Sequence, residues 1–213
     1  TVSEDSEVDG VTNDSSGPKT VTVTVTDDGK GKLSASVSVS TDNPLTFTNT
    51  YNVKTTTATV PVTKALSVPE GLTGPASIKE AYTFTLTPQG GAPAPATSSV
   101  KNPDANGGTA SFGAITFVAP GTYTYKITEA GTVAGVTNDP AATSGKTVTI
   151  EVKDNSDGTL TATVKGADGQ GSSTTFTNSY AAGSTTASIP VTKLLSYDSG
   201  LTPPDITEKF TFT

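Results

Sequence analysis

The chain contains no cysteine, methionine, tryptophan, histidine or arginine. Without cysteine it can form no disulfide bond, and without cysteine and histidine it lacks the common nitrogen and sulfur metal ligands and every catalytic scheme built on them. With no arginine and a net charge of −7, it also lacks the basic surface that nucleic-acid binding requires. A secreted protein with no disulfide needs a large core or another covalent cross-link.

Charged and hydrophobic residues are also scarce, at 15% and 32% of the chain, both below the average for globular proteins. Disordered segments are usually highly charged and aperiodic, whereas here apolar residues alternate with threonine and serine, which favours ordered β-structure. No apolar run approaches the length of a membrane helix, so we expect no membrane insertion in this segment. No signal peptide is visible, and we expect any export and anchoring signals to lie outside this segment.

The sequence repeats itself. Three segments occur twice, two at an offset of 129 residues (176 − 47 and 190 − 61) and one at an offset of 125 (135 − 10): residues 47–51 and 176–180, 61–64 and 190–193, and 10–14 and 135–139. We therefore expect one complete repeat in residues 52–180. Residues 1–51 are then the C-terminal part of a preceding repeat, and residues 181–213 the N-terminal part of a following one.

The incomplete ends have two explanations. We favour a segment cut from a longer array, in which the partners are neighbouring repeats of the same chain. The alternative is head-to-tail contact in which the ends of different copies complete one domain. That domain would lack central strands and would keep open sheet edges.

Alternation of apolar and polar residues predicts β-strands at residues 20–26, 32–40, 81–87, 122–128, 146–153 and 159–164. Residues 27–29 and 156–158 are typical of hairpin turns, and residues 87–91 and 102–108 of loops. No segment has a helical pattern. Many short strands with frequent turns predict an all-β fold of the sandwich type.

Three strands, predicted at residues 61–66, 123–129 and 176–180, each place one polar residue on an otherwise apolar face. These residues are Lys64 beside Val62 and Leu66, Glu129 beside Tyr125 and Ile127, and Asn178 between Phe176 and Tyr180. Burying a lone charge costs several kcal/mol, about as much as the stability of a whole domain. Burial favours the neutral forms of an amine and a carboxyl group, and a neutral amine is a nucleophile. Lys64 could then attack the carboxamide of Asn178, with Glu129 as acid and base, to expel ammonia and form an isopeptide bond.

Each of these residues alone has an ordinary explanation. An inward lysine can extend its amine to the surface at a sheet edge or pair with a glutamate, and an asparagine near a strand end is often a turn residue. Recurrence favours the reaction, because Lys64 aligns with Lys193, Asn178 with Asn49, and Glu129 with Glu4.

These motifs, at residues 62–64, 125–129 and 176–178, resemble those of Gram-positive pilin isopeptide-linkage domains, the FctA-type modules related to the CnaB-like β-sandwich. The resemblance implies an Ig-like or CnaB-like β-sandwich in tandem repeats, with Lys64 bonded to Asn178 and Glu129 assisting. It also implies that Glu4 and Asn49 serve the preceding repeat and that Lys193 serves the following one. The chain lacks the Tyr-Pro-Lys-Asn motif of polymerising pilins, which favours the repeat stalk of a long adhesin.

The predicted function is therefore a structural stalk, extracellular and attached to the cell wall of a Gram-positive bacterium, with no enzymatic activity beyond formation of its own bond and no cofactor. The alternative is an adhesin domain that binds a ligand, of unknown identity, through the loop at residues 90–108. Residues 154–158 superficially resemble a calcium loop, but they lack the distant glutamate of an EF-hand and are better explained as a hairpin turn, so we expect no metal site.

Overall fold

The computed structural model describes residues 1–213 with the exception of residues 6, 41, 168 and 170. The strands are β1 (Val11–Thr12), β2 (Val23–Asp27), β3 (Leu33–Val37), β4 (Thr50–Tyr51), β5 (Thr56–Ala58), β6 (Pro61–Ser67), β7 (Tyr82–Pro88), β8 (Ser99–Lys101), β9 (Gly107–Ser111), β10 (Ile115–Phe117), β11 (Gly121–Gly131), β12 (Val136–Thr137), β13 (Lys146–Asp154), β14 (Leu160–Lys165) and β15 (Thr174–Tyr180). Within the described residues, no helix has the length and apolar character needed to cross a membrane.

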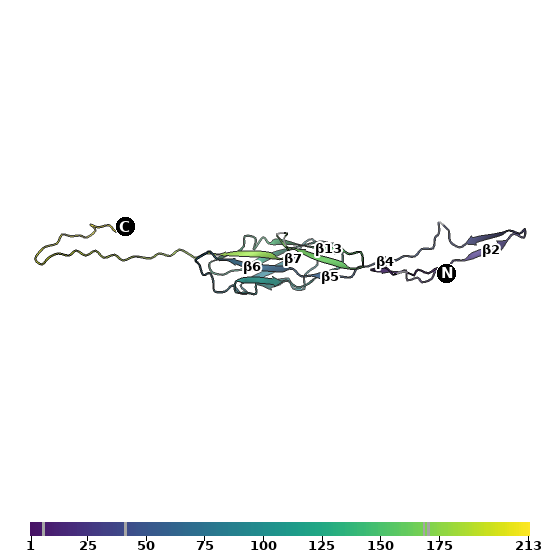
Figure 1. Ribbon diagram of the computed structural model, residues 1–213, viewed down its shortest axis with the longest axis horizontal. Helices are drawn as coiled ribbons and strands as arrows, with labels where there is room; N and C mark the ends of the chain where they lie inside the picture. The colour runs from purple at the N-terminus through teal and green to yellow at the C-terminus, as the bar shows by residue number, and fades with distance from the viewer. Residues whose placement is uncertain (6, 41, 168, 170) are drawn as a thin grey trace. The chain divides into compact units, whose positions relative to one another are not determined.

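Two sheets form the body of the protein (Figure 1). One has five strands in the order β14-β13-β11-β7-β8, and the other has four in the order β12-β15-β6-β9. Their inner faces meet in a single apolar core, in which the rings of Phe84 and Phe176 lie 5.5 Å apart across the two sheets. The predicted all-β sandwich is confirmed, because alternating side chains of strands such as β7 and β13 are buried in this core.

The predicted strands are all present, with shifted ends. The predicted loops at residues 87–91 and 102–108 are partly wrong, since β7 continues to Pro88 and β9 begins at Gly107. Gly107 and Gly108 adopt left-handed φ angles of 124° and 82° yet pair with Ala65 and Lys64. Sequence composition suggests a loop at two adjacent glycines, whereas here they let one backbone lie close against another.

Strands β6 and β15 are neighbours although they lie far apart in the sequence. They run parallel, with Phe176 opposite Lys64 and Asn178 opposite Leu66. In sequence order, β6 is the first strand of the four-stranded sheet and β15 is the last, and the two are hydrogen-bonded to each other. This places the lysine and asparagine faces side by side, directed at the same core.

The chain divides into two compact units, Thr1–Ala182 and Gly183–Thr213. In the first unit, the hairpin β2–β3 leaves apolar side chains such as Val25 and Leu33 more than half exposed, at 58% and 66%. In the second unit, all of whose residues are described, residues 190–193 repeat part of β6 but form no strand. Within that unit they have no counterparts of β9 and β15 to pair with, and an isolated strand is unstable in water.

We predict that Gly107→Ala destabilises the sandwich by more than about 1 kcal/mol, because a left-handed residue with a Cβ is strained. At this position the Cβ would also collide with the carbonyl oxygen of Lys64. The control is Gly90→Ala, which is also left-handed (φ 56°) but has open space around its Cβ. Denaturant unfolding should show the larger loss for Gly107→Ala, and equal losses would contradict the close approach of β9 to β6.

Candidate functional site

The side chain of Lys64 lies wholly inside the sandwich, with none of its surface exposed. Alternation along β6 directs it inward together with Val62. Its Nζ lies 2.7 Å from Glu129 Oε1 and 3.4 Å from the carbonyl oxygen of Phe176, and 4.6 Å from the ring centre of Tyr82. Burial lowers the pKa of the Lys64 ammonium, although the hydrogen bond and charge of Glu129 oppose this shift.

Glu129 reaches the same point from the opposite sheet. It lies on β11 opposite Phe84 of β7, and its side chain is also fully buried. Oε1 contacts Lys64, whereas Oε2 has no hydrogen-bond partner among the described residues. A buried carboxylate with one unpartnered oxygen is costly in its charged form. Transfer of the proton from Nζ to the carboxylate within this contact would give the neutral amine and the neutral acid together.

Asn178 completes the group. It is fully buried on β15, and its Nδ2 donates to the same Oε1 of Glu129 at 3.5 Å and to Asn138 Oδ1 at 3.2 Å. One carboxylate oxygen therefore contacts both the lysine nitrogen and the nitrogen that the predicted condensation would expel. The structure thus brings together the three residues predicted from the sequence, while the bond itself stays a prediction.

The carbonyl oxygen of that carboxamide is also held. Asn178 Oδ1 accepts a hydrogen bond of 2.7 Å from the backbone N–H of Asp139. A fixed N–H group aimed at this oxygen would stabilise the negative charge that develops there when a nucleophile attacks the carbon. The carboxamide is therefore polarised on one side by Asp139 and flanked on the other by Glu129.

Asp139 is itself anchored by its side chain. Oδ2 accepts hydrogen bonds from Lys146 Nζ at 2.8 Å and from the backbone of Thr177 at 2.9 Å, and Oδ1 accepts one from Ala141 at 2.9 Å. Burial alone would raise the pKa of Asp139, but these hydrogen bonds outweigh it and hold the pKa below its usual value. Sequence reasoning missed this anchor, although Asp139 lies in one of the segments that occur twice.

The same arrangement exists in residues 1–51, without a lysine nucleophile. Asn49 Nδ2 donates to Glu4 Oε1 at 2.5 Å, and Asn49 Oδ1 accepts from the backbone of Asp14 at 2.9 Å. Asp14 pairs with Lys19 at 2.9 Å and accepts from Thr48, as Asp139 does with Lys146 and Thr177. Glu4 Oε2 is buried and has no hydrogen-bond partner among the described residues. The two residues predicted to serve the preceding repeat thus lie in contact.

Lys193 belongs to the unit Gly183–Thr213, where its Nζ lies 4.8 Å from the ring centre of Phe210. Lys64 lies over Tyr82 in the same way, at 4.6 Å, and Tyr82 is the aligned residue of the complete repeat. The predicted role of Lys193 in a following repeat stays a prediction.

Residues 90–108 and 154–158 are the other candidate regions, and a ligand-binding role of residues 90–108 stays a prediction. The segment at residues 90–108 contains β8, and Asn102 within it is fully buried, donating to the backbone of Ile78 and accepting from that of Tyr82. Residues 154–158 connect β13 to β14 as a hairpin turn, as predicted. Across the part of the chain that the structure describes, no group of three or more acidic side chains is gathered as a metal site would need.

Comparison with known families agrees with this geometry. The family model FctA, described as a Spy0128-like isopeptide containing domain, matches residues 1–52 and 60–181, which is most of the chain. No curated protein matches the chain. Domains of this family occur in surface pilins of Gram-positive bacteria and are typically structural rather than enzymatic. The buried lysine–glutamate pair, the all-β fold and the family match lead to one conclusion: the chain belongs to the FctA family of isopeptide-containing domains.

Proposed function

We propose that Lys64 and Asn178 condense into an intramolecular isopeptide bond, and that the bonded repeat is a load-bearing segment of a stalk. That stalk would belong to an adhesin or pilus-like fibre attached to the cell wall of a Gram-positive bacterium. The observation that carries the proposal is that the lysine nitrogen and the carboxamide nitrogen contact the same buried oxygen of Glu129, at 2.7 and 3.5 Å.

The residues of the site can supply and accept every proton that the condensation moves. The neutral amine of Lys64 attacks Cγ of Asn178, and the oxygen that becomes negative stays on the backbone N–H of Asp139. Glu129, which took a proton from the Lys64 ammonium, gives that proton to the departing nitrogen and accepts the one that the new bond displaces from Nζ. The C–N bond of the carboxamide breaks, ammonia leaves, and a secondary amide joins the two strands. No external reagent is required, because Glu129 contacts the nitrogens of both reactants.

The position of the bond suits a protein under tension. Force that enters at Lys64 would cross the new amide and leave at Asn178, so the chain between them would carry no load. Only the linkers would extend. The linker from Asn49 to Lys64 has the same length as that from Asn178 to Lys193, 15 positions (64 − 49 and 193 − 178), which allows at most about 50 Å each.

The bond would also stabilise a chain that is rich in threonine and serine. In the chain-entropy model, closing a loop of this size stabilises the fold by roughly 4–5 kcal/mol. The cross-link would thus have the role that disulfides have in other secreted proteins, in a chain without cysteine.

The first test is the intact mass of the folded chain. We expect it to be lighter than calculated by one ammonia molecule, and Glu129→Ala to keep its full calculated mass because proton transfer is lost. The matched control is Glu4→Ala, which alters the corresponding glutamate in residues 1–51 and should leave the deficit unchanged. A folded wild-type chain of full mass would refute the bond, and a deficit on peptides other than those of Lys64 and Asn178 would refute its position.

Loss of the bond should lower stability. Asn178→Ala, which keeps the contact between Lys64 and Glu129, is expected to reduce the free energy of unfolding of the sandwich by at least about 4 kcal/mol. Asn49→Ala removes the corresponding contacts from residues 1–51 and should change this value little. Denaturant unfolding followed by tyrosine fluorescence gives the comparison, and similar midpoints for Asn178→Ala and the wild type would contradict a cross-linked native state.

The anchor of Asp139 should affect the rate of bond formation more than its final extent. Asp139→Asn keeps the backbone N–H but weakens the contact with Lys146, so we expect ammonia loss after refolding to be slower by about tenfold or more. Asp14→Asn is the control, with an unchanged rate. Mass spectrometry over time measures both, and a normal rate in Asp139→Asn would exclude this positioning role.

A further inference from the structure

A contact unrelated to the isopeptide site joins residues 1–51 to the sandwich. The phenol of Tyr51, the last residue of β4, donates a hydrogen bond of 2.6 Å to Asp154 Oδ1 and accepts one of 3.2 Å from the backbone of Gly158. Asp154 is the last residue of β13, and Gly158 lies in the turn that connects β13 to β14. Just beyond Tyr51, the backbone N–H of Lys54 donates to the carbonyl of Gly158 at 2.8 Å.

Two glycines make this approach possible. Gly10 and Gly158 both adopt left-handed φ angles, 76° and 77°, and a Cβ on Gly10 would lie 2.5 Å from the Cα of Gly158. The same Cβ would lie 2.7 Å from a ring carbon of Tyr51. The two backbones therefore meet with no side chain between them, and no other residue fits at either position. Tyr51 remains 44% exposed, so its hydroxyl group and the backbone hold the contact more than burial of the ring does.

One side of this contact consists of Gly10 and Tyr51, and it recurs in the chain as Gly135 and Tyr180. Val11 pairs with Tyr51, and Val136 pairs with Tyr180 in the same way. A Cβ on Gly135 would lie 2.8 Å from the ring of Tyr180, as one on Gly10 would from Tyr51. The residue after each tyrosine donates to the carbonyl of the matching glycine, at 2.8 Å for Gly10 and 2.9 Å for Gly135.

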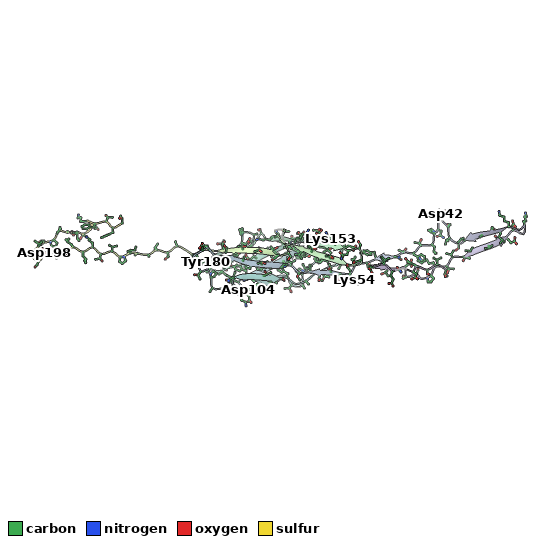
Figure 2. All side chains as sticks on the ribbon, in the orientation of Figure 1. Asp42, Lys54, Asp104, Lys153, Tyr180 and Asp198 are labelled. Atoms are coloured by element: carbon green, nitrogen blue, oxygen red, sulfur yellow. The ribbon has the colours of Figure 1, made fainter. Side chains whose placement is uncertain are left out.

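The other side of the contact, which binds the tyrosine, also recurs. Asp154 and Gly158 have counterparts in Asp27 and Gly31, with the same spacing in the sequence. Asp27 pairs with Leu33 across its hairpin as Asp154 pairs with Leu160. Gly31, like Gly158, is left-handed, with φ of 86°. In the complete repeat the two sides lie at opposite ends of the sandwich, as shown by Tyr180 at one end and by Lys54 and Lys153 at the other (Figure 2).

We propose that the hairpin of residues 154–158 is a docking site for the tyrosine-bearing end of a preceding repeat, and that this joint recurs along the array. Asp27 and Gly31 are the docking site of the preceding repeat, and Gly135 and Tyr180 are the end that docks on the following one. The partner is a second repeat of the same kind, recognised by a phenol that donates to a carboxylate and by a glycine that admits its backbone. In the absence of load, the joint fixes the linker between repeats, and this linker extends only when force separates the two sides of the joint.

The protonated form of the Tyr51 phenol is the one that can donate to Asp154, and the contact favours this form. The hydrogen bond to Asp154 raises the pKa of the Tyr51 phenol, and desolvation adds to the shift. Because the pKa is raised in the joined state, the contribution of this contact is complete below the usual pKa of tyrosine and is lost as the pH rises through the raised value.

The test uses the full chain, whose lack of cysteine allows two introduced cysteines to be spin-labelled selectively. Ser15→Cys and Thr163→Cys place labels on exposed positions on the two sides of the joint. We expect a narrow distance distribution in the parent chain and one at least twice as broad after Tyr51→Phe, which keeps the ring but removes the hydroxyl group. Gly158→Ala should broaden it further, since its Cβ would meet Gly10.

The matched controls are Tyr180→Phe and Gly31→Ala, which alter the corresponding residues outside this joint and should leave the distribution narrow. A phenol titration gives an independent readout: Tyr51 and the buried Tyr125 should both titrate above the usual pKa of tyrosine in the parent chain, and in Tyr51→Phe the group of Tyr51 should be missing while that of Tyr125 remains. A narrow distribution in Tyr51→Phe, or equal broadening in Tyr180→Phe, would overturn the proposal. Because ammonia loss at Lys64 is measured separately by mass, failure of the joint is distinguishable from failure of the isopeptide bond.

Discussion

The contact between Lys64 and Glu129 is the constraint on which the rest of the site depends. Two fully buried ionisable groups 2.7 Å apart incur a desolvation cost that their attraction only partly offsets. In the proposed reaction both become neutral and one becomes part of an amide, so the product no longer has a buried charge. Three features hold the reactants in this arrangement: the close approach of Gly107 of β9 to the backbone of Lys64, the parallel pairing of β6 with β15, and the anchored N–H of Asp139.

The sequence was sufficient to predict the sandwich and the three residues that meet in its core, because each of the three occupies an inward position in a strand of period two and recurs in a second copy. It was not sufficient to predict Asp139. The contribution of that residue to the carboxamide comes from a backbone N–H, which every residue except proline has, and the side chain acts only by fixing it. Nor could composition predict that Gly107 and Gly108 belong to β9, since the reason is the nearness of another backbone.

Residues 1–51 show which contacts of the site form without a complete sandwich. The contacts among Glu4, Asn49 and Asp14 are present although the described residues of this segment form no sandwich, but a hairpin, a two-residue strand pair and one isolated β-bridge. In contrast, the apolar side chains of β2 and β3 are exposed, because the described part of residues 1–51 forms no second sheet that covers them. The hydrogen bonds around the carboxamide thus form in residues 1–51 between residues 35 and 45 positions apart, whereas the apolar core is formed by the sandwich.

The order of the reactive residues along the chain has a consequence for biosynthesis. Lys64 lies on β6, near the start of the complete repeat, and Asn178 lies on β15, at its end. A chain emerging from the ribosome carries the amine long before the carboxamide exists, and β15 can pair with β6 only when the intervening strands have been made. The proposed condensation would be irreversible once ammonia diffuses away. The bond could therefore form only in a repeat that has been synthesised completely. Complete repeats would be covalently cross-linked, whereas nascent or truncated ones would not.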